Sequence, residues 1–334
     1  MKKKILIIRF SSIGDIVLSS PVFRCVKNQL PEVEVHFLTK ISFKIVTAAN
    51  PYIDKFFYYV DNIEELIINL KEENYDHVID LHNNIRSNKI KRALKKDTHT
   101  IDKLTYQKFL LTQLNIDVMP NRHITQRSLD TLLPLGVKDD GGGLDYFIAK
   151  HDEVKPDDLP TSHLAGYIVI VIGATYFTKR FPIHKQIELC SKIDHPIILL
   201  GGKEDKKMGE EIATTDKVKI YNACGKFNIS ESADIVKKAK LVISNDTGMQ
   251  YIACALKRPV IALWGGTSPD LDVEPYYGSN YISHQQKPVY ENVVLNLICQ
   301  PCSKYGLKKC PKEHFNCMEK IDVNSLAEMV KSRL

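Results

Sequence analysis

Short apolar runs alternate with amphipathic segments along most of the chain. In the first half, the apolar runs lie at 5–8, 34–39, 56–60, 77–81 and, with a weaker pattern, 98–101. Helical periodicity separates or follows them at 63–73, 86–96, 105–114 and 123–135. Continuous apolar runs are typical of parallel strands, because helices cover both faces of such a sheet. The pattern therefore predicts a doubly wound parallel sheet of five strands.

A polar stretch from Gly141 to Pro160 interrupts this alternation. It opens with three consecutive glycines and is typical of a connection between domains. The pattern then restarts, with strands expected at 167–172, 197–200, 218–221, 241–244 and 260–264, and helices at 182–193, 204–213, 230–239, 248–257 and within 321–334. With 334 residues the chain is too long for one ordinary core. We therefore predict two α/β domains, 1–155 and 156–334, facing a cleft.

The segment 241–269 shows one strand–helix–strand unit in its clearest form. Its helix presents an apolar stripe and ends before Pro259, and a glycine loop from Gly265 to Pro269 follows the second strand. Asp246, Thr247 and Gly248 lie in the turn after the first strand. Open α/β sheets bind ligands at such strand ends, and the N–H groups at a helix start suit an anion. An ordinary capped turn explains the same residues.

The loop after the first strand, residues 9–21, carries the first candidate for catalysis. Ser11, Ser12 and Gly14 form a polar turn, and Asp15 follows them. Asp15 either caps the next helix or accepts a proton from a bound hydroxyl group. The turn lacks G-x-G-x-x-G, so the pattern does not indicate a dinucleotide fold.

Two loops of the second domain suggest a nucleotide site. In 171–182 a glycine turn, Thr175 and Lys179 follow a strand, which favours phosphate binding, although a solvated cation is an equal alternative. In 201–205, Glu204 or Asp205 either binds ribose hydroxyls or caps a helix.

The basic helix 86–96 follows the fourth strand of the first half. A solvated face is its default interpretation. Arg86 lies nearest the strand end and is therefore the residue of this helix expected to face the cleft.

Composition narrows the functional classes. The chain is 44% hydrophobic and 26% charged, as soluble globular proteins are. Its net charge of +6 favours anionic partners but is too small to indicate nucleic acid. Arg9 ends the N-terminal apolar run too early for a signal peptide, and an apolar span of transmembrane length is absent. We therefore expect a cytoplasmic protein with reduced thiols.

Four of the eight cysteines gather near the C-terminus. Cys299, Cys302, Cys310 and Cys317 follow the spacing C-x2-C-x7-C-x6-C. Four thiolates suit tetrahedral zinc, and C-x2-C is a common half-site. The second pair lacks this tight spacing, so free thiols are the alternative.

In their residues and in their order along the chain, these segments resemble those of glycosyltransferase family 9, the ADP-heptose:lipopolysaccharide heptosyltransferases and their relatives. The matching segments are KKKILIIRFSSIGDIVLSSPVFRCVK, YDHVIDLHNNIRS, GAT…TKRFP, GGKED and SNDTGMQYIACALKRPVIALWGGTSP. The resemblance implies a GT-B fold with an N-terminal acceptor domain and a C-terminal donor domain. It also implies inverting transfer of heptose from an ADP-sugar to a glycolipid of the lipopolysaccharide inner core.

The resemblance assigns roles to individual residues. Asp15 matches the catalytic base, while Thr175 and Lys179 match contacts to the donor phosphates. Glu204 lies near the ribose contact, and Asp246, Thr247 and Gly248 match the D-T-G donor motif. Ser11, Ser12, Gly14 and Arg86 are expected on the acceptor side. Tyr251 departs from the family, which usually carries His there, and tyrosine bears no proton charge near neutrality.

We therefore predict an inverting glycosyltransferase that works as a monomer and without a metal in catalysis, because Lys179 and a helix dipole neutralise the leaving diphosphate. Its expected partners are an ADP-sugar and a glycolipid at the inner membrane, on whose cytoplasmic face it would be peripheral. Two alternatives stay open. One is a sugar-nucleotide epimerase, which needs further acid/base groups in the cleft, and the other is a non-catalytic glycan- or nucleotide-binding relative.

Overall fold

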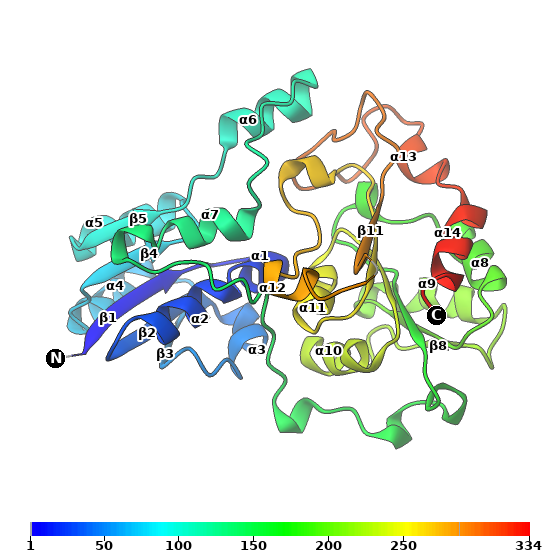
Figure 1. Ribbon diagram of the computed structural model, residues 1–334, viewed down its shortest axis with the longest axis horizontal. Helices are drawn as coiled ribbons and strands as arrows, with labels where there is room; N and C mark the ends of the chain where they lie inside the picture. Colours follow the sequence, from blue (N-terminus) through cyan, green and yellow to red (C-terminus); the bar gives the residue numbers. More distant parts are fainter. Residues whose placement is uncertain (1, 287) are drawn as a thin grey trace. The chain divides into compact units, whose positions relative to one another are not determined.

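The computed structural model of the protein describes residues 2–286 and 288–334 (Figure 1). The chain forms two compact units, and neither is one continuous stretch. The first unit contains the chain up to Lys103 together with 122–147 and 277–283. The second contains 104–121, 148–276 and the chain from His284 onward. The segment 104–121 thus packs with the second unit although the residues on both sides of it belong to the first. The segment 277–283 packs with the first unit although its flanking residues belong to the second.

The first unit is built on a parallel sheet of five strands in the order β3-β2-β1-β4-β5. Its main elements are β1 (Lys3–Ile8), α1 (Ile13–Leu18), α2 (Ser20–Gln29), β2 (Val33–Lys40), α3 (Lys44–Thr47), β3 (Lys55–Tyr59), α4 (Ile63–Glu72), β4 (His77–Asp80), α5 (Ile85–Leu94), β5 (Asp97–Thr100), α7 (Ile124–Asp130) and α12 (Ser279–Ile282). Leu6 and Val78 face a core formed with α4 and α5. Phe37, on the opposite face, packs edge-to-face against Phe23 of α2 with ring centroids 4.8 Å apart. Helices thus cover both faces.

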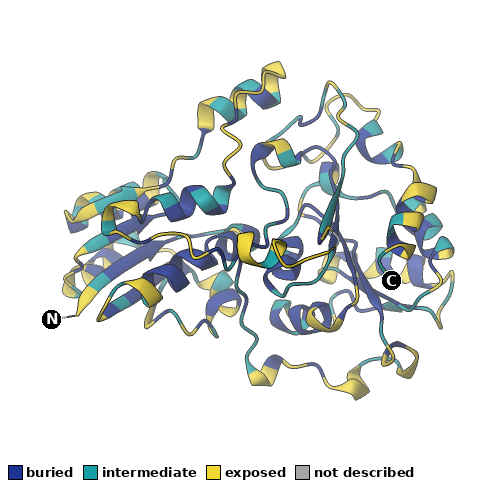
Figure 2. Cartoon of the chain, in the orientation of Figure 1, coloured by how far each residue is buried: buried dark blue, intermediate teal, exposed yellow. Residues whose placement is uncertain are grey.

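The second unit is built on a parallel sheet of six strands in the order β11-β10-β9-β6-β7-β8. Its main elements are α6 (Thr105–Phe109), β6 (Ile168–Val171), α8 (Ile183–Lys192), β7 (Ile197–Leu200), α9 (Lys206–Ala213), β8 (Ile220–Asn222), α10 (Ile229–Lys238), β9 (Val242–Asn245), α11 (Gly248–Ala255), β10 (Val260–Leu263), β11 (Tyr290–Val293), α13 (Asn316–Glu319) and α14 (Val323–Lys331). The central strands are buried, while the helices keep an exposed outer face (Figure 2).

The predicted α/β fold of two doubly wound parallel sheets is confirmed. Two helices differ from expectation. The segment 105–114 is α6 followed by a π-helical turn from Leu110 to Leu114, and 123–135 divides into α7 and a 3-10 turn, Leu133–Leu135. The strand β11 was not predicted, because its sequence YENV is half-buried at the sheet edge and lacks an apolar run.

Both sheets reverse their strand order at one place. In the first unit the reversal lies between β1 and β4, and in the second it lies between β6 and β9. Ligands of open α/β sheets bind beyond the carboxyl ends of the strands at such points. The loops after β1, β4, β6 and β9 are therefore the places to look for a site.

The connection after Gly141 is shaped by its glycines. Gly143 has a φ of +75°, and a Cβ there would lie 2.0 Å from the Tyr277 carbonyl oxygen. Only glycine allows this close approach.

No helix within 2–286 and 288–334 is long and apolar enough to cross a membrane.

Candidate active site

Asp15 lies in the first turn of α1, directly after β1. One of its carboxylate oxygens accepts hydrogen bonds from the Ser12 N–H (3.0 Å) and hydroxyl (2.7 Å). The other oxygen pairs with the Arg9 guanidinium at 2.6 Å. The side chain is still 37% exposed. Asp15 therefore serves the capping role and presents a carboxylate to solvent, so the two interpretations are compatible.

The surroundings of Asp15 keep it ionised. Burial acts to raise the pKa of this carboxyl group, but the charge of Arg9 and the hydrogen bonds from Ser12 outweigh burial, and its pKa lies below the ordinary value. The group is therefore a carboxylate at neutral pH. Such a carboxylate can orient a hydroxyl group and receive its proton as the hydroxyl becomes acidic during reaction.

Arg9 connects the ends of β1 and β4, which flank the strand-order reversal. Its guanidinium donates hydrogen bonds to the carbonyl oxygens of Ser11, at 2.9 Å, and of Leu81. Burial, followed by the positive charge of Arg9, lowers the pKa of the neighbouring His82 to about 4. His82 is therefore neutral at pH 7, and the site carries one ionised carboxylate held by one arginine.

The remaining acceptor-side candidates occupy different environments. Ser12 binds the carboxylate, the Ser11 carbonyl oxygen accepts a hydrogen bond from Arg9, and Gly14 is buried in α1. Arg86 is exposed on the first turn of α5, and its guanidinium lies over the Tyr59 ring, 5.3 Å from the centroid. The structure thus gathers the serines around Asp15 and places Arg86 beside β3.

In the second unit, three loops meet at the Asp246 carboxylate. Lys179, at the end of the turn after β6, lies 2.6 Å from one carboxylate oxygen. The Thr267 hydroxyl, in the loop after β10, donates to the same oxygen at 2.8 Å. Asp246 is 7% exposed, and the Lys179 side chain is 16% exposed. The loops after β6, β9 and β10 are therefore joined by one buried ion pair.

Tyr251 lies on α11, one turn beyond this carboxylate. Its hydroxyl is 3.3 Å from the second oxygen of Asp246 and 2.8 Å from the Val273 carbonyl oxygen. The residue is 5% exposed. At the position where the sequence resemblance predicts His, a tyrosine hydroxyl group therefore hydrogen-bonds to this cluster.

Other donor-side candidates surround this cluster. Thr247 and Gly248 are half-buried at the N-terminus of α11, whereas Thr175 and Glu204 are exposed in the loops after β6 and β7. Asp205 instead has a structural contact: its buried carboxylate accepts the Gly202 N–H at 2.9 Å. Burial raises the pKa of Asp205. Of the two acidic residues in this turn, Glu204 is the accessible one.

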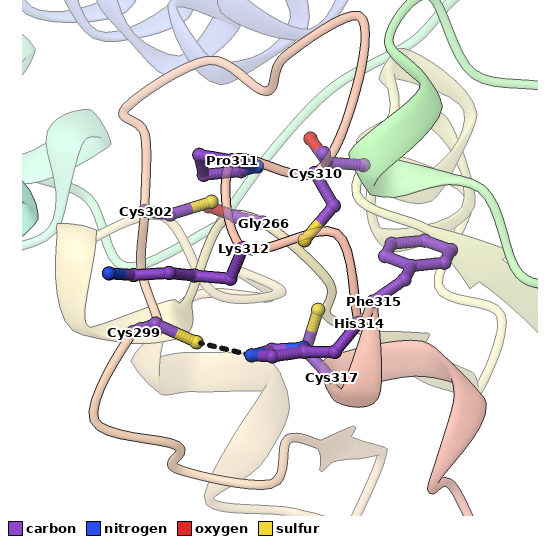
Figure 3. Close-up of a pocket in the computed structure, with 10 residues that line it drawn as sticks. Gly266, Cys299, Cys302, Cys310, Pro311, Lys312, His314, Phe315 and Cys317 are labelled. Carbon is purple, nitrogen blue, oxygen red and sulfur yellow. Dashed lines mark hydrogen bonds between the residues drawn. The ribbon is translucent and has the colours of Figure 1, made fainter.

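The four C-terminal cysteines line one pocket with His314 (Figure 3). They are free thiols, and the Cys299 sulfur lies 3.9 Å from Nε2 of His314. Thr178 and Gly266 also line this pocket, so it adjoins two of the loops around Asp246. The cysteine spacing alone predicts neither that His314 lines the pocket nor that the pocket adjoins Thr178 and Gly266.

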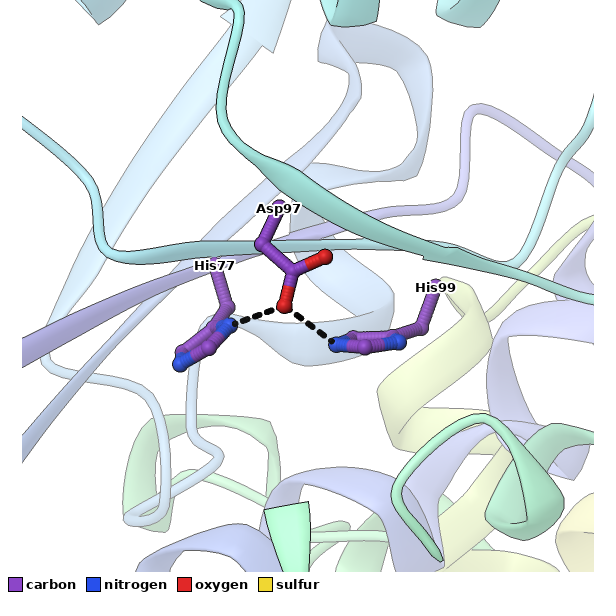
Figure 4. A group of neighbouring side chains, drawn as sticks. All are labelled: His77, Asp97 and His99. Carbon is purple, nitrogen blue, oxygen red and sulfur yellow. Dashed lines mark ion pairs between the residues drawn. The ribbon is translucent and has the colours of Figure 1, made fainter. Parts of the chain in front are cut away.

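A second group of metal-ligating side chains lies at the opposite ends of the strands. His77 begins β4, and Asp97 and His99 lie on β5 (Figure 4). Both imidazoles approach the same Asp97 oxygen, at 3.3 and 3.4 Å. Among the described residues, this is the group of three ligand atoms that lie within 4.8 Å of one another. Sequence analysis missed it, because the three residues belong to two strands without a motif.

Sequence analysis also missed Arg9 and Thr267. Arg9 immediately follows a candidate strand and Thr267 lies in the glycine loop after another, which was an available signal. Their partners, however, are set by packing: Arg9 reaches Asp15 and Leu81, and Thr267 reaches Asp246.

The sequence of this chain matches that of a known protein family. The family described as "Glycosyltransferase family 9 (heptosyltransferase)" matches residues 63–315. Lipopolysaccharide heptosyltransferase 1 of Campylobacter coli is 25% identical over 291 residues, covering 79% of this chain and 84% of that protein.

Two solved structures from Escherichia coli share the fold. ADP-heptose lps heptosyltransferase II has a TM-score of 0.72 at 17% identity, covering 100% of this chain and 98% of that one. A heptosyltransferase solved with ADP-2-deoxy-2-fluoro heptose has a TM-score of 0.70 at 20% identity, covering 99% and 100%. The fold of this chain is therefore that of the heptosyltransferases, the GT-B fold.

The contact between Arg9 and Asp15 makes a testable prediction. Replacing Arg9 with Met should raise the pKa of Asp15, because the main stabilising charge is lost while burial remains. The acidic limb of any Asp15-dependent activity should move to higher pH for the same reason. NMR titration of the Asp15 carboxyl carbon measures the shift. Arg86→Met is the control, since Arg86 lies over Tyr59; an unchanged Asp15 pKa in Arg9→Met would contradict this account.

Proposed function

This chain belongs to glycosyltransferase family 9, and we propose that it moves a heptosyl group from an ADP-sugar to a glycolipid of the lipopolysaccharide inner core. The observation that carries the proposal is the placement of two kinds of chemistry. An ionised carboxylate lies at the strand-order reversal of one sheet, and a lysine-bearing, anion-suited cluster lies at that of the other. The names of the relatives support heptose and ADP as the donor's parts.

In this proposal, residues 1–155 bind the acceptor and 156–334 bind the donor. Ser11, Ser12 and Gly14 supply hydrogen-bonding and close backbone approach beside Asp15. Arg86 is available to an anionic part of the acceptor, because its guanidinium is exposed above Tyr59. We also propose that the protein acts as a monomer, since all of these residues come from one chain.

The reaction is a single displacement with inversion. The acceptor hydroxyl oxygen bonds to the anomeric carbon of the donor sugar, and the bond from that carbon to the phosphate oxygen breaks. The hydroxyl proton passes to Asp15, and ADP departs with the bonding electron pair. Asp15 suits this role, because Arg9 and Ser12 keep it ionised and oriented.

The donor diphosphate is proposed to lie between Lys179 and the start of α11. Lys179 supplies a cation and Thr175 a hydroxyl group, while Thr247 and Gly248 lie where the helix presents unpaired N–H groups. Glu204 is placed to accept hydrogen bonds from ribose hydroxyls. Asp246 would repel phosphate, so we assign it to holding Lys179 in position and to accepting bonds from sugar hydroxyls.

Peripheral attachment to the cytoplasmic face of the inner membrane is the proposed location. The segment 105–118 supports it, because five of its large apolar side chains are exposed: Tyr106, Phe109, Leu114, Ile116 and Val118, at 69%, 54%, 55%, 48% and 48%. Aromatic and aliphatic side chains of this kind bind at the lipid interface. The net charge of +6 favours an anionic membrane.

The four-cysteine pocket is proposed to hold a structural zinc ion. Cys299, Cys302, Cys310 and Cys317 converge on one cavity from a segment that is otherwise poor in regular structure (Figure 3). Four thiols suit Zn²⁺, and a metal of this kind stabilises a loop that lacks its own core. The ion takes no part in the displacement reaction.

Asp15→Asn should lower the transfer rate by about 10²–10⁴-fold, the usual worth of a general base. Donor affinity should barely change, because the donor residues lie in the other unit. Steady-state kinetics with ADP-heptose and a heptose-free acceptor glycolipid measure the rate. Asp130→Asn, at an exposed pair with Arg122, is the matched control. Near-normal turnover in Asp15→Asn would contradict the assignment of Asp15 as the general base.

Lys179→Ala should lower turnover by roughly 10²–10³-fold, because charge grows on the diphosphate as the glycosidic bond breaks. It should also weaken ADP binding more than adenosine binding, as calorimetry can measure. Lys192→Ala on α8 is the control, and thermal unfolding checks that Asp246 tolerates losing its partner. Equal losses for both ligands would show that Lys179 is not a phosphate ligand.

The membrane proposal predicts that Phe109→Ser combined with Leu114→Ser reduces co-sedimentation with anionic vesicles. Two interfacial apolar groups are lost, while the overall charge is kept. Val218→Ser is the control, because Val218 is 76% exposed in a different segment. Binding that is unchanged in the double variant would exclude this segment as the attachment site.

The zinc proposal predicts about one equivalent of zinc per chain after purification without added metal. Elemental analysis measures it. Cys302→Ser together with Cys317→Ser should abolish the metal content, whereas Cys190→Ser should not, because Cys190 is buried in α8 away from the pocket. A metal-free wild-type protein, or one that holds iron instead, would contradict the assignment of zinc.

A further inference from the structure

The segment that carries the four cysteines, residues 299–317, is bound to the loop after β10. The Gln300 side-chain amide donates to the carbonyl oxygens of Trp264 and Gly265, at 3.1 and 2.9 Å. The N–H groups of Cys302 and Ser303 both donate to the Gly266 carbonyl oxygen at 3.1 Å. This segment, which we call the thiol loop, therefore holds the backbone just before Thr267.

The thiol loop is also bound to the turn that carries Lys179. The Thr178 N–H donates to the Leu307 carbonyl oxygen at 3.1 Å, and the Leu307 N–H donates to the Thr178 hydroxyl at 2.8 Å. Thr178 is 1% exposed, and its own carbonyl oxygen accepts the Gly266 N–H at 2.7 Å. The turn after β6, the loop after β10 and the thiol loop thus form one hydrogen-bonded layer.

Gly306 brings the thiol loop directly against Lys179. Its φ is +99°, and a Cβ at this position would lie 2.7 Å from the Tyr176 side chain and 3.0 Å from Cδ of Lys179. The lysine stem is thus bounded by the thiol loop on one side, while its ammonium group pairs with Asp246. The position of Lys179 depends on where the thiol loop lies.

Zinc binding requires the thiol loop to contract. Tetrahedral zinc with bonds of about 2.3 Å separates its sulfur ligands by roughly 3.8 Å. Among the described residues, no three of the pocket's thiols and His314 place their ligand atoms within 4.8 Å of one another. The sulfurs must therefore move together around an ion, and a shift of the Cys302 backbone would be passed to Gly266 through their hydrogen bond.

From these contacts we infer that metal binding in the thiol pocket positions Lys179 and Thr267 for the donor diphosphate. The inference rests on the proposed donor site. Zinc draws the four cysteines together, the thiol loop is fixed, and its bonds to Thr178 and Gly266 fix the two loops that contact Asp246. The cysteines are positioning residues, since their effect reaches the donor only through Lys179 and Thr267.

A metal-independent thiol loop is the competing explanation. Phe315 stacks on Phe177 with ring centroids 4.8 Å apart, and Met318 is fully buried near Gly265. If these apolar contacts suffice, zinc would stabilise the fold without changing the affinity for ADP.

The test compares nucleotide binding by the same protein with and without zinc. Zinc is removed from the full-length protein with a chelator under reducing conditions, the chelator is removed, and circular dichroism confirms the fold. Calorimetry then measures ADP and adenosine. ADP should bind at least about tenfold more weakly without zinc, the worth of one hydrogen bond to a charged group. Adenosine should be little affected, and one equivalent of Zn²⁺ should restore ADP binding.

Two kinds of variant separate the outcomes. Cys302→Ser should behave as the zinc-free protein does, while Cys190→Ser should behave as wild type. Gly306→Ala should keep its zinc yet lose ADP affinity, because the added Cβ displaces Tyr176 and Lys179. This variant tests the mechanical link even where the metal-free protein does not stay folded.

Each result has one interpretation. Unchanged ADP affinity in folded zinc-free protein would overturn the inference whatever Gly306→Ala shows, while a loss in Lys179→Ala would leave the proposed function standing. If Lys179→Ala also binds ADP normally, the donor site itself has been misplaced. Equal losses of ADP and adenosine would show a general structural role and would likewise overturn the inference.

Discussion

The second unit depends on the pairing of Asp246 with Lys179. The two side chains are largely buried and lie 2.6 Å apart, and they join loops from three strands. A buried pair of this kind adds little to the free energy of unfolding, because each charge lost its hydration on folding. Removing one partner typically costs about 3–5 kcal/mol, because the other charge is left uncompensated. The pair therefore fixes the loops after β6 and β9 relative to each other, and our proposal places the donor diphosphate against this fixed geometry.

The first unit also holds a carboxylate with a cation, but its carboxylate is much more exposed than the cation. Here the arginine is the covered partner, and the carboxylate keeps 37% of its surface in solvent. Arg9 also donates to carbonyl oxygens on both sides of the strand-order reversal, so it is held by backbone groups rather than by Asp15 alone. A carboxylate held in this way stays ionised and oriented but can still be reached by an acceptor.

Sequence reasoning located the loops and could not locate their contacts. The apolar runs predicted ten of the eleven strands. Ile, Val and Leu mark the buried central strands, whereas edge strands carry weaker patterns: β5 (DTHT) was expected only from a weak pattern, and β11 (YENV) was missed. Asp15, Lys179 and Asp246 were proposed as site residues because each lies in the loop after such a run. The contact between Lys179 and Asp246 was beyond reach, since it depends on β6 and β9 being neighbours, which only the strand order reveals. The partners of Asp205 and Arg86, likewise, follow from packing and not from position in a motif.

Tyr251 shows why the neutral character of this cluster matters. Asp246 and Lys179 already balance in charge, and the tyrosine hydroxyl adds a hydrogen bond without a further charge. A protonated imidazole at the same place would make the cluster net positive and would attract the diphosphate before any bond breaks. With tyrosine, the cluster keeps the balanced charges of Lys179 and Asp246. In the proposed donor site, stabilisation of the leaving diphosphate therefore depends on Lys179, which the contacts with Asp246 hold in place.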